Sequence, residues 1–156
     1  MLTKTKNTKK IKFSVITVTK NSEKHLEKNI LSVQKQTYQN YEHIIIDGNS
    51  QDKTKKILRR HKSRLRIISE NDNGLYDAMN KGIKLASGDV ICILNSDDFY
   101  YKKALQIMNR YFVHNPQIDF VFGSVIKYNR IQSGFAAWKI HWTFGFYSAH
   151  SVGFFI

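Results

Sequence analysis

Hydrophobic and polar residues follow one another along the chain with two different periods. Short runs rich in β-branched residues predict β-strands, at residues 13–18, 41–46, 65–68 and 90–94. Between these runs, apolar residues recur every three or four positions, as Leu26, Ile30 and Val33 do, which indicates amphipathic helices. Helices are therefore expected near residues 21–37, 50–62, 75–86 and 101–113, and a strand or hairpin arm at 118–128.

Strands that alternate with helices predict an α/β fold, a Rossmann-like three-layer α/β/α sandwich around a mostly parallel sheet. The run at 90–94 is apolar on both faces, as expected of a central strand. The third predicted helix has one apolar face, formed by Leu75, Met79, Ile83 and Ala86. A length of 156 residues suits one domain, at residues 12–156, after a basic lead-in at 1–11.

Polar residues stand where several predicted strands end. In parallel sheets, ligands bind beyond the carboxyl ends of the strands, which directs attention to 17–21, 47–50 and 95–98. Asp97 and Asp98 follow a buried strand, and two adjacent carboxylates suit Mg²⁺ or Mn²⁺, which share oxygen ligands with phosphates. The alternative is that one of the two aspartates only caps the following helix.

Three further polar residues have both a functional and an ordinary explanation. Asp47 could accept hydrogen bonds from a base or a ribose, or form a turn with Gly48. Asp77 and Asn80 are three residues apart on one predicted helix, so both could face one cleft, or both could be solvated. Neither a GxGxxG nor a GxxxxGK[ST] segment occurs, which argues against dehydrogenases and P-loop NTPases.

The net charge of +13 is unevenly distributed. Residues 1–66 carry 17 Lys and Arg against 5 Asp and Glu, whereas residues 67–156 carry 8 against 7. The basic half suits an anionic partner, which leaves phosphate, anionic lipid and nucleic acid open. The single cysteine, Cys92, suits a reducing cytoplasm. Since the amino-terminal segment lacks the apolar core of a signal peptide and no run reaches the roughly 18 apolar residues of a membrane span, a cytoplasmic protein is expected.

Four segments together resemble the family-2 glycosyltransferases of GT-A fold, in the branch that builds bacterial surface polysaccharides such as lipopolysaccharide. They are FSVITVTKNS at 13–22, IIIDGNSQDKT at 44–54, SENDNGLYDAMNKGIKLASGD at 69–89 and ILNSDD at 93–98. The resemblance covers residues 12–130, with a weaker trace at 150–154. It implies that residues 12–156 form a nucleotide-sugar-binding GT-A domain.

The resemblance also implies roles for individual residues. The base pocket is expected to be lined by Thr17, Val18, Lys20 and Asn21. Asp47 is expected to contact the base or the ribose, and the segment with Asp77 and Asn80 to close over the nucleoside and diphosphate. Asp97 is expected to hold the ribose and Asp98 the Mn²⁺ or Mg²⁺ ion, as this chain's DXD-type motif. His150 is expected near the metal and diphosphate, or else in the core.

Two departures from the family pattern limit these expectations. Lys20 stands where many relatives carry an aromatic residue, so a cation contact replaces base stacking, and uridine is only the default base. The family's general base is a carboxylate well downstream of the DXD motif, so it is expected beyond Ile156 and no catalytic residue is identified. The domain is therefore expected to be incomplete at its carboxyl end, with donor binding encoded and the transfer step missing.

Three functional hypotheses follow. The first is an inverting, metal-dependent glycosyltransferase that takes a sugar from a UDP-linked donor. Its acceptor would be a growing, lipid-linked glycan at the inner face of the cytoplasmic membrane, where the lysines would contact anionic lipid, or else serve only solubility. The second is a non-catalytic pseudo-transferase that binds a nucleotide sugar or a partner. The third, a nucleic-acid-binding module, is disfavoured because most aromatic residues lie away from the lysines.

Overall fold

The computed structural model describes residues 10–122, 125–127, 130–132, 135–137 and 154–156. In chain order the elements are β1 (Phe13–Thr19), α1 (Leu26–Gln34), β2 (Tyr41–Asp47), α2 (Thr54–His61), a 3-10 turn (Lys62–Arg64), β3 (Arg66–Ser69), α3 (Leu75–Leu85), β4 (Val90–Ile93), α4 (Ala104–His114), β5 (Phe120–Phe122), β6 (Val125–Lys127), β7 (Arg130–Gln132), β8 (Phe135–Ala137) and β9 (Phe154–Phe155). Among the described residues, no helix is long and apolar enough to cross a bilayer.

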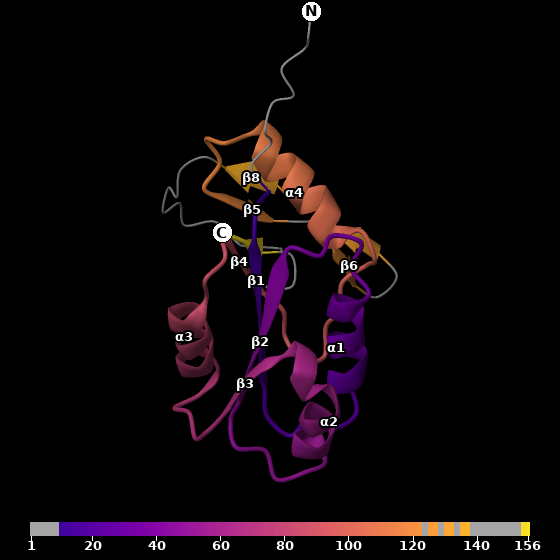
Figure 1. Cartoon of the computed structure of the whole chain (residues 1–156), viewed down its shortest axis with the longest axis vertical. Helices are drawn as coiled ribbons and strands as arrows, with labels where there is room; N and C mark the ends of the chain where they lie inside the picture. The colour runs from indigo at the N-terminus through magenta and orange to yellow at the C-terminus, as the bar shows by residue number, and fades with distance from the viewer. Residues whose placement is uncertain (1–9, 123–124, 128–129, 133–134, 138–153) are drawn as a thin grey trace, which may run out of the picture.

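Seven strands form one sheet in the order β3-β2-β1-β4-β9-β5-β8, and β6 and β7 form a separate hairpin (Figure 1). Strands β3, β2, β1 and β4 are parallel to one another. Strand β9 is antiparallel to both of its neighbours, β4 and β5, and β8 is antiparallel to β5. The predicted α/β fold with a parallel central sheet is confirmed.

Helices cover both faces of this sheet (Figure 1). Side chains alternate between the two faces of a strand, and β1 shows this clearly. Phe13 and Val15 pack with residues of α1 and α4, whereas Ile16 and Val18 pack with Ala78 of α3 on the opposite face. Strand β1 is buried along its whole length, which makes it the centre of the core.

Helix α3 contacts the sheet through small residues and through only part of the apolar face expected from its sequence. Its buried residues are Ala78 and Gly82, whereas Leu75 is 52% exposed and Ile83 is 42% exposed. A Cβ atom at Gly82 would run into Cγ2 of Ile16. Met79 and Ala86 of the expected face pack against the core as well, but Leu75 and Ile83 do not, because the two small residues let the helix backbone approach the sheet closely.

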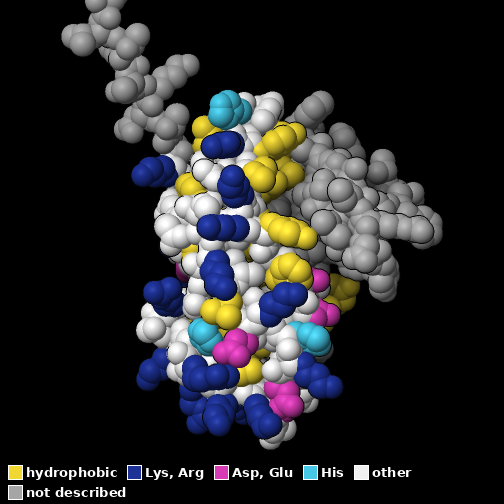
Figure 2. Space-filling model, turned by 90° about the vertical axis from the view of Figure 1, so that its right-hand side faces the viewer, with side chains coloured by type: hydrophobic (Ala, Val, Ile, Leu, Met, Phe, Trp, Pro, Cys, Tyr) yellow, Lys and Arg dark blue, Asp and Glu magenta, His cyan; other side chains and the backbone are white. Residues whose placement is uncertain are grey.

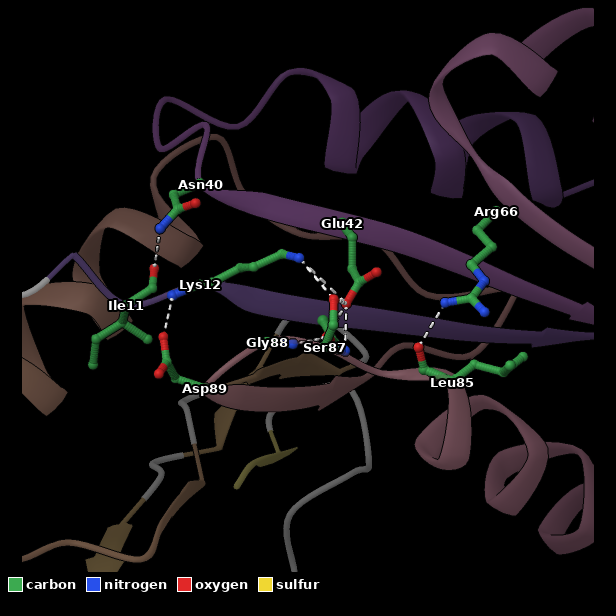
Figure 3. Close-up of polar contacts among 10 residues, drawn as sticks. Ile11, Lys12, Asn40, Glu42, Arg66, Leu85, Ser87, Gly88 and Asp89 are labelled. Atoms are coloured by element: carbon green, nitrogen blue, oxygen red, sulfur yellow. Dashed lines mark hydrogen bonds and ion pairs between the residues drawn. The ribbon is translucent and has the colours of Figure 1, made fainter.

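Glu42 connects three segments at the amino ends of the strands, the edge opposite to the carboxyl ends (Figure 3). Its Oε1 atom accepts hydrogen bonds from Ser14 Oγ at 2.6 Å, Ser87 N at 2.7 Å and Ser87 Oγ at 2.8 Å. Burial alone would raise the pKa of Glu42, but these hydrogen bonds and the nearby Lys12 ammonium outweigh it and lower that pKa. Gly88 allows the close approach, because a Cβ there would lie 2.7 Å from Lys12 O.

Candidate functional site

A cleft of about 760 Å³ lies at the carboxyl edge of the parallel strands. Such a volume is typical of ligand pockets. The residues that line it follow β1, β2, β3 and β4, so four segments distant in sequence meet there. They are residues 18–25, Asp52, the group Asp72, Gly74, Leu75 and Ala78, and residues 95–97.

One part of the cleft lining is apolar and carries a single carboxylate. Val18, Leu75 and Ala78 contribute the apolar surface. Asp72 lies above Gly48, where a Cβ atom would run into its Oδ2 atom, while its Oδ1 atom accepts a hydrogen bond from Gly74 N at 3.0 Å. The stem of Lys20 passes beside the same glycine, with Cδ 3.3 Å from that position. An apolar surface next to one carboxylate acceptor is suited to bind a flat ring that carries an N–H group.

The segment after β4 contributes another acidic part of the lining. Asn95, Ser96 and Asp97 line the cleft, and Asp97 is exposed. The side chain of Asp98 is turned toward Asn95, whose Nδ2 atom donates to Asp98 Oδ2 at 3.4 Å. Ser96 Oγ lies 2.9 Å from Ser22 Oγ, which joins this segment to the loop after β1. The two adjacent aspartates therefore have different positions, with only Asp97 in the cleft lining.

The loops after β1 and β2 are held together by backbone-to-side-chain hydrogen bonds. Asn21 has a positive φ of 50°, a conformation that asparagine tolerates better than most residues. Its backbone nitrogen donates to Ser50 Oγ and its Oδ1 atom accepts from Gln51 N, both at 2.8 Å. Asp52 Oδ2 accepts from Glu23 N, and Glu23 Oε2 accepts from Lys53 N, each at 3.0 Å. Glu23 and Asp52 thus fix the rim of the cleft.

Two residues expected at the ligand are instead fully buried. Thr17 has 0% exposure, and its Oγ1 atom bonds to Asn29 and His43. Asp47 also has 0% exposure, and its carboxylate accepts hydrogen bonds from Ser50 and Ser69. Neither residue lines the cleft. Thr17 is buried because its side chain points to the sheet face opposite to that of Val18. The carboxylate of Asp47 is taken up by Ser50 in the turn that follows it and by Ser69.

Helix α3 does not bring its polar pair into the cleft. Asp77 Oδ2 accepts from Asn73 N at 2.9 Å and lies 3.4 Å from Lys81 Nζ. The hydrogen bond from Asn73 is the main cause of the lowered pKa of Asp77. Asn80 is exposed and does not line the cleft. Asp77 and Asn80 lie outside the cleft lining because the helix presents Leu75 and Ala78 there, and Asp77 accepts a hydrogen bond from the loop before the helix.

The structure brings together Val18, Lys20, Asn21 and Asp97 from the predicted set. Asp72 was missed, although it lies in a segment that carries the family resemblance. The sequence contained one signal for Asp72: this aspartate stands two residues before Gly74, which directly precedes a predicted helix. His150 lies outside the described residues.

The carboxylates after β4 are compatible with a hard cation. Within the described part of the chain, no three His, Cys, Asp or Glu residues come close enough to hold a metal by themselves. Mg²⁺ commonly takes only one or two protein carboxylates and fills its remaining positions with phosphate oxygens and water. Asp97, which lines the cleft, can supply one such carboxylate if a diphosphate supplies other ligands, and Asp98 would supply a second only by turning from Asn95.

An α/β sheet with a mixed apolar and acidic cleft beyond its parallel strands defines a Rossmann-like protein with the architecture of nucleotide-binding domains. The family model described as Glycosyl transferase family 2 matches residues 14–151. The chain therefore belongs to glycosyl transferase family 2.

Relatives and solved structures agree with this assignment. The chain is 34% identical over 128 residues to the UDP-Glc:alpha-D-GlcNAc-diphosphoundecaprenol beta-1,3-glucosyltransferase WfgD of Escherichia coli, covering 80% of this chain and 50% of that protein. It resembles the crystal structure of S. aureus TarS 1-349 in complex with UDP-GlcNAc, with a TM-score of 0.65, 28% identity, and coverage of 70% of this chain and 33% of that one.

A third likeness concerns the fold alone. The mannosyltransferase PcManGT from Pyrobaculum calidifontis, in complex with GDP-Man and Mn²⁺, has a TM-score of 0.64 at 22% identity, covering 72% of this chain and 35% of that one. These neighbours confirm the GT-A fold. The chain spans half or less of the length of these relatives.

Proposed function

We propose that this chain provides the donor-binding part of an inverting, metal-dependent glycosyltransferase that uses a UDP-sugar. The observation that carries the proposal is one cleft that joins an apolar surface and the Asp72 carboxylate to Asp97 at the end of β4. A uracil ring and a diphosphate need these two kinds of surface in one site. The family membership supports the same reading.

The base would lie against Val18 and Leu75, with the stem of Lys20 beside it. Uracil has one ring N–H, at N3, and this donor needs an acceptor when it is buried. Asp72 is the carboxylate that lines this part of the cleft and already accepts Gly74 N through its other oxygen. We therefore assign base selection to Asp72, in place of Asp47.

The diphosphate would lie toward Asp97, with Asp98 as the neighbouring carboxylate. When bound there, Mn²⁺ or Mg²⁺ would act as a Lewis acid that neutralises the charge developing on the departing diphosphate. The protein's part is to hold Asp97 at the cleft and to place Lys20 and Lys24, which also line it, near the anionic donor. His150 remains a proposed additional ligand.

We assign no general base to this cleft. Direct displacement at the sugar requires a base that deprotonates the acceptor hydroxyl. The rim carboxylates of Glu23 and Asp52 are already engaged by backbone N–H groups of the facing loops. In Asp52 these bonds outweigh the pKa-raising effect of burial and lower its pKa, which makes it a poor proton acceptor at neutral pH.

The acceptor we propose is a lipid-linked glycan at an anionic membrane surface. The name of the E. coli relative gives a diphosphoundecaprenol-linked acceptor for that protein. In this chain, Lys and Arg side chains gather where α2 lies on the face that carries α1, α2 and α4 (Figure 2). The exposed ones on α2 or in the residues directly before and after it are Lys53, Lys56, Arg59, Arg60, Lys62 and Arg64. Each basic residue near an anionic surface contributes about 1 kcal/mol to membrane binding.

Calorimetric titration of the full chain with UDP and GDP, with and without Mn²⁺, tests the donor assignment. Metal-dependent binding of UDP, with GDP weaker, is expected. Asp97→Asn and Asp98→Asn are each expected to reduce the metal-dependent part. Binding of UDP that neither Mn²⁺ nor these variants alter would remove the aspartates from the proposed role.

A further inference from the structure

Asn29 of α1 binds both ends of the acidic turn after β4, which consists of residues 95–98. Its side chain is 1% exposed and lies behind the cleft lining. The Nδ2 atom donates to Asn95 O at 2.8 Å and to Asp98 O at 2.9 Å. Both N–H groups of the amide are therefore used, one by the residue before Ser96 and the other by the residue after Asp97. Since Asp98 N also donates to Asn95 O at 3.0 Å, the turn is closed on itself and attached to the helix.

The other end of the Asn29 side chain is held from the sheet. Because Nδ2 must donate to two carbonyl groups, Oδ1 faces Thr17, whose Oγ1 atom donates to it at 3.2 Å. His43 Nε2 lies 3.0 Å from the same Oγ1. The hydroxyl proton of Thr17 is already given to Asn29, so His43 must donate from Nε2. The hydrogen bonds therefore run in one direction, from β2 through β1 and α1 to the acidic turn.

The protonation state of His43 agrees with this direction. Its ring is 3% exposed, and burial lowers its pKa to about 3, so the ring is neutral at physiological pH. With the proton on Nε2, Nδ1 is an acceptor, and it has no hydrogen-bond partner among the described residues. A buried polar group without a partner costs stability. The Thr17 contact is consequently the one that orients the ring.

We propose that Asn29, oriented by Thr17 and His43, sets the position of Asp97 in the cleft and thereby the affinity for a metal–diphosphate pair. The inference rests on the proposed function of that site. Asn29 is a positioning residue, because it contacts the backbone of the turn and not the ligand. Residues that orient metal ligands from behind typically change metal affinity about 10- to 100-fold when mutated.

The chain provides a matched control in Gln36, just beyond the same helix. Its side chain is 2% exposed, its Nε2 atom donates to Ser32 O and Tyr101 O, and its Oε1 atom accepts from Leu105 N. Gln36 is thus an equally buried amide, and it binds the backbone of the segment that follows the acidic turn. Asn29→Leu and Gln36→Met each remove one such amide, but only the first releases the turn.

The test measures UDP binding with and without Mn²⁺, uridine binding, and urea unfolding for both variants. For Asn29→Leu, we expect metal-dependent UDP affinity to fall about 10- to 100-fold while uridine affinity is unchanged. Gln36→Met should lose comparable stability and keep both affinities. Thr17→Val, which removes only the hydroxyl, should give a smaller loss of the metal-dependent part and serves if Asn29→Leu does not fold.

Two results would overturn the inference while leaving the proposed function in place. One is wild-type metal-dependent affinity in Asn29→Leu or, if that variant does not fold, in Thr17→Val. The other is an equal loss in Asn29→Leu and Gln36→Met. If the wild-type chain itself shows no metal-dependent UDP binding, the proposed function fails first, and the inference fails with it.

Discussion

The carboxylate of Asp72 occupies the space that a side chain at Gly48 would need. A Cβ atom at position 48 would run into Asp72 Oδ2 and lie 3.2 Å from its Cγ. The glycine that follows β2 thus leaves room for an acid from the loop before α3. The two residues belong to different loops and form one feature of the cleft.

Asp72→Asn should change which pyrimidine nucleotide binds. A carboxylate accepts the N3–H of uracil, whereas a carboxamide can present N–H to N3 of cytosine, which is an acceptor. The carboxamide oxygen can still accept from uracil N3–H, but a neutral hydrogen bond is only about half as strong as a charge-assisted one, so UDP affinity should fall up to about 10-fold and CDP affinity should rise relative to it. Competitive titration with the two diphosphates in the presence of Mn²⁺ measures the ratio.

Two further variants make this result specific. Glu70→Gln changes a nearby acid that pairs with Lys81 and does not line the cleft, so it should leave the UDP-to-CDP ratio as it is. Gly48→Ala should displace the Asp72 carboxylate and weaken UDP binding, with little loss of stability. An unchanged ratio in Asp72→Asn would exclude this residue as the base-selecting group.

Gly82→Ala should destabilise the fold although alanine is the better helix former. The substitution normally gains about 1 kcal/mol within a helix, but here the new methyl group would run into Ile16 and lie 3.4 Å from Ile46 Cγ1. Overpacking of this kind costs about 1–3 kcal/mol, so a net loss in the free energy of unfolding is expected from urea denaturation. Lys84→Ala, on the exposed side of the same helix, should be close to neutral; a more stable Gly82→Ala would contradict the close packing.

Buried His43 should make the protein sensitive to moderate acid. Its pKa is lowered to about 3 in the fold, against about 6.5 in an unfolded chain. Between these values the unfolded state binds more protons, so stability rises with pH and is fully present above about pH 6.5. As the pH falls toward 3, this group should remove up to about 5 kcal/mol, at 1.36 kcal/mol for each pH unit.

Urea unfolding from pH 4.5 to 8 checks this dependence. His43→Gln lacks the titrating ring and should show a flatter pH dependence than the wild type between pH 4.5 and 6.5, whatever its absolute stability. Parallel curves for the two proteins would mean that His43 does not cause the acid sensitivity.

Glu42→Gln should weaken the amino-terminal edge of the sheet at neutral pH. Hydrogen bonds to a charged group contribute about 1.5–3 kcal/mol each, and Glu42 accepts three of them at one oxygen. Because its pKa is lowered in the fold, its contribution is present above the unfolded value and is lost as the pH falls through the folded one. The stability difference from the wild type, measured by urea unfolding, should therefore shrink at pH 3; a constant difference would indicate that the charge of Glu42 is unimportant.

The alternation of strands and helices up to α4 could be predicted from the sequence, because a strand repeats every two residues and a helix every 3.6. The short strands β7, β8 and β9 were not predicted. Helix α1 was placed correctly by Leu26, Ile30 and Val33, all of which are buried. Its start was placed too early, since the residues from 21 form a loop held by side chains of the facing loop. Periodicity does not report how closely two elements approach, so the packing of α3 through Gly82 was not foreseen.

The cleft lies at the edge of the sheet that the sequence indicated, and its lining contains only some of the residues predicted for the site. Val18, Lys20, Asn21 and Asp97 line the cleft because they follow strands that end at one edge of the sheet. The neighbouring Thr17 does not, since adjacent strand residues point to opposite faces. Asp72 went unnoticed because its importance depends on the empty space at Gly48, which comes from another part of the chain.

The sequence by itself predicts the α/β class, the edge of the sheet where a ligand would bind and the acidic character of that edge. Each of these follows from the short-range periodicity of hydrophobic residues and from residue type. Which carboxylate faces the cleft is a matter of long-range contacts. Asp47 is covered by Ser50 and Ser69, and Asp72 enters over Gly48. The balance between solvation and burial that separates these two acids arises only when distant loops pack together.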